Sequence, residues 1–137
     1  MRSEFIIAIW LATFKNAGEL ANYVEWKYSE SEDNPQCNFA DDVGLKYFDE
    51  DFLESFFADA SAELMEQIDN ISFVENFKED LLATLASINT TGKNSIISLS
   101  GKKDPYGTVN EMLFDLTHKQ YDKEYLQFVG LYKYSEA

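Results

Sequence analysis

The side chains best able to do chemistry are the carboxylates crowded into residues 37–59, CNFADDVGLKYFDEDFLESFFAD. This stretch holds seven acidic residues and a single cation, Lys46. Clustered carboxylates could ligate a metal ion, act as a general acid and base, or contact a basic partner. The seven are Asp41, Asp42, Asp49, Glu50, Asp51, Glu54 and Asp59.

Metal binding and hydrolysis are the chemical uses of such a cluster. Asp49, Glu50 and Asp51 could ligate Ca²⁺ or Mg²⁺, because both ions prefer oxygen ligands. The run lacks the turn glycine and the bidentate glutamate of an EF-hand calcium loop, so no metal site is predicted. A glycosidase needs two carboxyl groups held across a cleft, which adjacent acids do not show. A carboxylate-dependent metal-binding protein or hydrolase therefore stays as the alternative function.

Other catalytic groups are scarce in this sequence. The single histidine, His118, lies near the end of a predicted helix, where a positive ring suits the helix dipole. The single cysteine, Cys37, can form no intrachain disulfide, so we interpret it as a structural or incidental thiol, and a reduced cytoplasm is the simplest compartment. The glycines are scattered and form no phosphate-binding loop. No catalytic residue and no cofactor is predicted, and the chain is not expected to be an enzyme.

The charge distribution narrows the choice of partner. The net charge is −14, and residues 1–90 carry 19 acidic and 5 basic residues, whereas residues 91–137 carry 6 of each. Such a field repels nucleic acid and anionic membranes and speeds the encounter with basic proteins. The apolar run at residues 5–14 is too short to cross a bilayer. Neither nucleic acid nor membrane is a predicted partner, and solubility alone could also explain the charge.

The scaffold predicted from the sequence is one domain, residues 1–137, because this length suffices for a hydrophobic core. Runs rich in β-branched and aromatic residues predict strands at residues 5–12, 52–57, 95–100 and 125–134. Helical spacing of apolar residues predicts helices near residues 16–27, 61–68, 72–88 and 108–116. The predicted fold is α+β, with a mainly antiparallel sheet of about four strands packed against three to four helices.

Local signals set the expected boundaries of these elements. Residues 39–43 should form one helical turn closed by Gly44, and residues 28–38 and 102–107 should be loops. Three pairs have the spacing of a helix N-cap and its partner: Asn16 with Glu19, Ser72 with Glu75, and Thr108 with Glu111. The apolar residues predicted to be buried within the acidic stretch are Phe39, Leu45, Phe52 and Phe56.

Aromatic residues next to the acids suggest a surface that binds a protein. Trp26 and Tyr47 could anchor a partner while the carboxylates steer it, a combination that favours fast and tight recognition. A solvated acidic rim over an aromatic core would have the same composition. The residues alone leave both interpretations open.

A resemblance to a known family favours the binding surface over the solvated rim. Five segments carry it: IWLATFK (9–15), FADDVGLKYFDEDFLESFF (39–57), SFVENFKEDL (72–81), NSIISL (94–99) and LQFVGLYKY (126–134). In these segments the chain resembles the immunity protein 22 family of bacterial polymorphic toxin systems. The acidic and aromatic segment is the most specific of the five, and residues 102–123 match least well.

The resemblance implies a cytoplasmic antidote that binds its cognate toxin directly and performs no catalysis. Toxins of such systems are often nucleases, whose active sites are basic because they hold phosphate. The hypothesis is that an acidic and aromatic face meets the cations of a basic toxin domain, and no oligomeric state is predicted. The predicted toxin-binding residues are Trp26, Asp41, Asp42, Tyr47, Asp49, Glu50, Asp51 and Glu54.

Overall fold

The computed structural model describes residues 3–28, 35–59, 63–116 and 123–134. These residues form the strands β1 (Glu4–Ala12), β2 (Leu53–Phe57), β3 (Ser95–Asp104), β4 (Gly107–Val109) and β5 (Leu126–Tyr134). They also form the α-helices α1 (Ala17–Val24), α2 (Asn38–Val43), α3 (Leu64–Gln67) and α4 (Lys78–Ser87). Short 3-10 helices lie at η1 (Glu50–Phe52), η3 (Ile68–Asn70), η4 (Val74–Asn76) and η5 (Glu111–Asp115).

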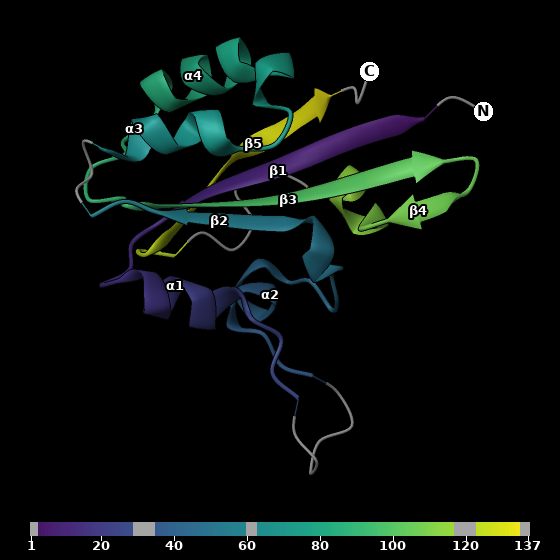
Figure 1. The fold of residues 1–137 in the computed structure, drawn as a ribbon, viewed down its shortest axis with the longest axis horizontal. Helices are drawn as coiled ribbons and strands as arrows, with labels where there is room; N and C mark the ends of the chain where they lie inside the picture. The colour runs from purple at the N-terminus through teal and green to yellow at the C-terminus, as the bar shows by residue number, and fades with distance from the viewer. Residues whose placement is uncertain (1–2, 29–34, 60–62, 117–122, 135–137) are drawn as a thin grey trace.

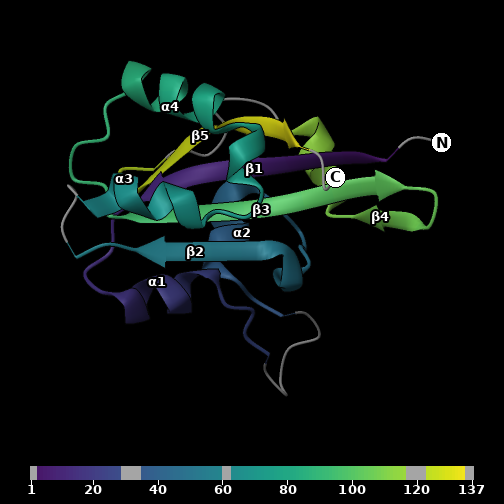
Figure 2. The same ribbon diagram turned by 45° about the horizontal axis from the view of Figure 1, so that its top comes forward.

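A single antiparallel sheet separates two helical layers. Its strand order is β2-β3-β1-β5, and β4 pairs with the last residues of β3 on the side that β2 also occupies. Helices α1 and α2 lie on one face of the sheet, and α3 and α4 lie on the other (Figure 1). The turned view in Figure 2 shows the same two layers, with β2 at one edge of the sheet. The predicted α+β class with an antiparallel sheet is therefore confirmed.

The central strand β1 is buried on both faces, as its continuous apolar sequence predicts. Trp10 faces the layer of α1 and α2, where its ring meets Phe39 edge to face at 4.9 Å between centroids. Ile9, on the opposite face, belongs to the hydrophobic cluster beneath α3 and α4. Because side chains alternate along a strand, β1 supplies both cores of the protein at once.

Two boundaries in the layer of α1 and α2 lie where the sequence predicts them, the start of α1 and the end of α2, whereas α1 ends at Val24, earlier than the predicted residues 26–27. The Asn16 side chain accepts a hydrogen bond of 2.9 Å from the backbone N–H of Glu19, which caps the start of α1. Helix α2 ends at Gly44, whose φ of 74° lies in the left-handed region that glycine adopts most easily. Phe39 and Leu45 are buried on either side of this cap, which confirms both as core residues.

The edge strand β2 corrects part of the predicted core. Its position confirms the strand expected at residues 52–57, and all five of its residues are half-buried. Phe56 packs only partly against the cluster beneath α3 and α4. Phe52 precedes the strand in η1, and its ring lies 5.9 Å from the Lys102 ammonium group, outside both buried clusters. The prediction that Phe52 is a core residue was wrong, because its side chain is only half-buried in η1, before the edge strand begins.

The predicted capping box at Ser72 is absent. The Ser72 backbone N–H and hydroxyl both donate to the Glu54 carboxylate, each at 2.9 Å, and Phe73 has a left-handed φ of 62°. The chain therefore forms η4 first, and α4 starts only at Lys78. The short helix expected at residues 61–68 is confirmed by α3 in its described part.

The predicted helix from Thr108 was also wrong. Strand β3 continues to Asp104, and residues 107–109 return as β4, with Thr108 opposite Lys103. The turn is closed by Asp104, whose side chain accepts a hydrogen bond of 2.8 Å from the backbone N–H of Tyr106. Asn110 then takes a left-handed φ of 48°, so that only the 3-10 helix η5 follows. The segment 102–107 is thus a hairpin instead of a loop, and it adds a fifth strand to the sheet.

No helix among the described residues has both the length and the apolar character needed to cross a membrane.

Candidate functional site

The centre of the candidate site is an aromatic stack, formed by Trp26 and Tyr47. Their rings are nearly parallel, with centroids 5.4 Å apart and planes 24° from each other. Trp26 is only 6% exposed and donates its indole N–H to the Phe48 carbonyl at 3.1 Å, whereas Tyr47 is 56% exposed. Trp26 is therefore a rigid support for Tyr47, and of the two predicted anchors Tyr47 alone offers much surface to a partner.

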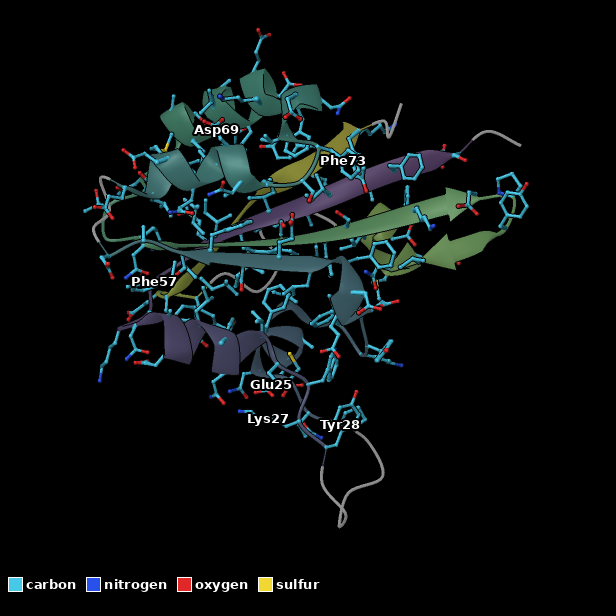
Figure 3. All side chains as sticks on the ribbon, viewed as in Figure 1. Glu25, Lys27, Tyr28, Phe57, Asp69 and Phe73 are labelled. Atoms are coloured by element: carbon cyan, nitrogen blue, oxygen red, sulfur yellow. The ribbon has the colours of Figure 1, made fainter. Side chains whose placement is uncertain are left out.

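The segment that follows α1 is fixed beside this stack. Lys27 and Gln36 exchange two backbone hydrogen bonds, of 2.7 and 2.8 Å, in an isolated bridge. Glu25, Lys27 and Tyr28 lie below α1 in Figure 3, on the side of the molecule away from α4. Tyr28 is 73% exposed, so this end of the molecule presents a second exposed aromatic side chain.

Hollows lie on two sides of Tyr47. The first, of about 560 Å³, is bounded by both members of the aromatic stack and by the exposed carboxylate of Asp41, with Lys46 also at its wall. The second, of about 300 Å³, is bounded by Tyr47, Asp49 and Glu111 together with the start of η5. Each hollow therefore combines the tyrosine with at least one carboxylate. This arrangement suits a cationic side chain, which can lie on an aromatic ring and meet an acid.

Asp42 is held by two tyrosines. One carboxylate oxygen accepts hydrogen bonds from the Tyr23 hydroxyl at 2.7 Å and from the Tyr125 hydroxyl at 2.6 Å. The hydrogen bond to Asp42 raises the pKa of Tyr125 to about 12. Burial, and then the same carboxylate, raise the pKa of Tyr23 above its ordinary value. Through these two hydrogen bonds Asp42, in α2, connects α1 to the residue that precedes β5.

Residues 49–51 form an acidic turn at the start of β2. Asp49 accepts a hydrogen bond of 3.0 Å from the backbone N–H of Asp51, which caps η1. Glu50 and Asp51 are exposed. The two ion pairs found among the described residues join Lys78 to Asp69 and Lys102 to Asp104, so neither reaches the acidic turn.

Asn110 holds the acidic turn against the sheet. Its side-chain oxygen accepts the Asp49 backbone N–H at 2.7 Å, and its amide donates to the Ser100 carbonyl at 2.8 Å. The side chain thereby fills the gap along β3 between the residues paired with β2 and those paired with β4. Sequence reasoning missed Asn110, although asparagine is the residue type that most readily replaces glycine at a left-handed position.

Glu54 lies apart from the other predicted site residues. Because side chains alternate along β2, Glu54 points to the face covered by α3 and α4, whereas Leu53 and Phe57 pack with α1 and α2. Both oxygens of the Glu54 carboxylate accept hydrogen bonds from Ser72. The structure thus brings Trp26, Tyr47, Asp41 and Asp49 together and places Glu54 on the opposite face.

Groups that could hold a metal or act as nucleophiles are few in the described chain. No cluster of three or more histidine, cysteine or acidic side chains is arranged to bind a metal among the residues that the structure describes. Cys37 is buried, its thiol lies 3.7 Å from the Tyr23 carbonyl, and burial raises its pKa. His118 lies outside the described residues.

An exposed tyrosine on a buried tryptophan, with carboxylates in the hollows beside it, is the type of surface with which proteins bind other proteins. Sequence comparison also indicates a protein that binds another protein. The chain belongs to the immunity protein 22 family, which it matches over residues 7–135. Membership of an immunity-protein family implies the role of an antitoxin that binds a cognate toxin. Neither a curated protein nor a solved structure matches the chain significantly.

Proposed function

We propose that this protein binds and neutralises a cognate toxin, a basic nuclease domain, in the cytoplasm of the cell that produces it. The observation that carries the proposal is Tyr47, an exposed ring fixed on a buried tryptophan between two hollows that each contain a carboxylate. Family membership supplies the antitoxin role, and this arrangement supports the place of contact.

The charge of the surface supports a basic partner. Asp41, Glu50 and Asp51 are exposed, and no ion pair within the described chain neutralises them. A nuclease active site carries cations that hold the phosphate backbone of its substrate. Carboxylates at the rim of such a site can take the place of phosphates, and Tyr47 can stack on an arginine side chain. The toxin is then inhibited because its substrate-binding cations are occupied.

The predicted site residues divide into two roles under this proposal. Asp41, Tyr47 and the acidic turn contact the toxin directly. Asp42 and Trp26 position the surface, because Asp42 is hydrogen-bonded to two tyrosines and Trp26 is buried. Glu54, which is bound to Ser72 on the opposite face, takes neither role. The proposal therefore predicts the largest affinity losses at the exposed residues.

The decisive experiment pairs the protein with the toxin domain encoded by the neighbouring gene. Replacing Asp49, Glu50 and Asp51 with Asn, Gln and Asn removes three charges, while the amide oxygen introduced at position 49 can still accept the capping hydrogen bond. We expect this triple variant to bind the toxin at least about tenfold more weakly and to lose protection in cells that express the toxin. Tyr47→Ala should cost about hundredfold in affinity, as is typical of an aromatic anchor.

A matched control removes the same charge from the other layer. Glu75, Glu79 and Asp80 are exposed on η4 and α4, and their replacement with Gln, Gln and Asn leaves the candidate site untouched. This control variant should retain nearly all affinity. Equal losses in both triple variants would show that only the net charge matters, and unchanged affinity in the first would refute the proposed contact surface.

A further inference from the structure

Strand β2 forms one edge of the sheet, and its outer side pairs with no other strand in the described structure. Within the described residues β2 pairs only with β3, and neither view of the ribbon shows a further strand alongside its outer edge (Figures 1 and 2). Helix α1 is the element drawn next to β2 on this side, and Leu53 and Phe57 of β2 pack against the hydrophobic cluster to which α1 belongs. Figure 3 places Phe57, the last residue of the strand, at this edge of the sheet.

The pairing register shows which backbone groups point outwards. The Ala58 N–H donates to the Asn94 carbonyl at 2.8 Å, and Ala58 continues the register in which Phe56 lies opposite Ile96. In an antiparallel ladder the residues that exchange hydrogen bonds alternate with those that do not. Glu54 and Phe56 therefore bond to β3, and the backbone groups of Ser55 and Phe57 point away from the sheet.

The ordinary protections of a sheet edge are missing from β2. Natural edge strands are usually guarded by lysine, proline or a β-bulge. The sequence of β2, LESFF, contains neither lysine nor proline, and its register with β3 is continuous. The one charged side chain, Glu54, is turned onto the face of α3 and α4, where it binds Ser72. At the other edge of the sheet, β5 carries Lys133 and has a register shift against β1.

Charge decides which extended segment fits this edge. The acidic turn lies immediately before β2, and Asp59 lies exposed just after it. A second copy of the chain would place like charges opposite each other, because antiparallel pairing of two β2 edges brings the acidic turn of one copy near Asp59 of the other. A segment with basic residues flanking a short extended stretch meets carboxylates at both ends.

We propose that β2 is a docking strand, to which the toxin adds a basic extended segment as a further strand of the sheet. This inference rests on the proposed function and names the manner in which the toxin binds. Main-chain hydrogen bonds to Ser55 and Phe57 supply affinity, and the acidic residues at both ends of β2 select the charge of the segment. The docking strand is continuous in sequence with the acidic turn, so both belong to one contact surface.

Amide hydrogen exchange of the wild-type protein tests the docking strand residue by residue. In the free protein the Glu54 and Phe56 amides should exchange slowly, and the Ser55 and Phe57 amides should exchange fast. After addition of the purified toxin domain from the neighbouring gene, Ser55 and Phe57 should become protected by at least about tenfold. A tight complex in which their exchange is unchanged would overturn the docking strand and leave the antitoxin role intact. Failure to form any complex would overturn both.

A proline substitution provides the second measurement. Ser55→Pro removes an outward N–H that β3 does not use, and proline is tolerated at such edge positions. We expect about tenfold weaker toxin binding, while the matched variant Ser55→Ala, which keeps the N–H, binds normally. Equal affinities of the two variants would contradict the proposal. So would protection of the Ser55 amide that increases with protein concentration in the absence of toxin, because it would identify a second copy of the chain as the occupant of the edge.

Discussion

Replacing Asn110 with alanine tests how the acidic turn is held to the sheet. In the wild-type protein this side chain bonds to the backbone of Asp49 and Ser100, and its own backbone has a left-handed φ of 48°. Alanine cannot make either hydrogen bond, and it is less tolerant of a left-handed backbone than asparagine. The substitution should therefore destabilise the fold through two separable causes.

The size of the effect follows from these two causes. Leaving the Asp49 N–H and the Ser100 carbonyl without partners costs about 1 kcal/mol each, because Asn110 is buried and water reaches the gap poorly. Forcing alanine into the left-handed region costs about 1 kcal/mol more. The free energy of unfolding should fall by about 3 kcal/mol in Asn110→Ala and by about 2 kcal/mol in Asn110→Gly, since glycine accepts the backbone conformation.

Urea denaturation of the three proteins, followed by circular dichroism, measures these differences. The wild-type protein should be the most stable, the glycine variant intermediate and the alanine variant the least stable. An alanine variant within about 0.5 kcal/mol of the wild type would refute the structural role of Asn110, because such a change is typical of an unimportant surface site. An alanine variant more stable than the glycine variant would refute the contribution of the left-handed backbone.

Three further predictions concern pH, packing and salt. Stability should fall as the pH rises from about 10 to about 12, because the pKa of Tyr125 is raised from 10.0 to about 12 in the folded protein and the unfolded chain loses this proton first. Asp42→Asn should weaken this dependence and lower the pKa of Tyr125 in an ultraviolet absorbance titration. Gly101→Ala should lower the free energy of unfolding by about 1–3 kcal/mol, since the new Cβ would lie 2.7 Å from the Asn110 backbone carbonyl oxygen and 3.0 Å from that of Val109. The association rate with the toxin should fall several-fold between low and physiological ionic strength, as stopped-flow mixing can measure, while dissociation changes less.

Each of these predictions has a result that would contradict it. A Tyr125 hydroxyl that titrates at the same pH in wild type and Asp42→Asn would show that the carboxylate does not set its pKa. Gly101→Ala with unchanged stability would mean that the backbone of Val109 and Asn110 can move away from β3 without cost. An association rate that is independent of salt would remove electrostatic steering from the proposed function.

Local sequence patterns predicted those elements whose signals agree with their tertiary surroundings. The apolar run that became β1, the Asn16 cap of α1 and the Gly44 end of α2 are all determined by a few neighbouring residues. Ser72 and Thr108 have the same capping spacing as Asn16, yet neither caps a helix. Glu54, 18 residues earlier, takes the hydrogen bonds of Ser72, and Thr108 pairs with Lys103 in a hairpin. Tertiary partners outweighed a local preference in both places.

The candidate site was predictable in composition and only partly in arrangement. The sequence indicated that acids and aromatics meet, and the structure brings Tyr47 to Trp26 and Asp41. Which aromatic ring is exposed depends on the packing of Trp26 against Phe48, and sequence spacing does not contain that information. The bond between Asp42 and Tyr125 joins residues 83 positions apart, which no periodicity could reveal.

Because β1 lies in the centre of the sheet, the sheet can form completely only after the strands on both sides of β1 have been synthesised. This strand is made first, but its two neighbours are β3 and β5, which come from the later part of the chain. Pairings between distant segments slow folding, and domains dominated by them commonly need milliseconds to seconds. Until β5 has left the ribosome, one apolar edge of β1 stays unpaired and is prone to aggregation. Under the proposed function, a cell is therefore protected only by chains translated through β5, and a truncation before this strand yields no antidote.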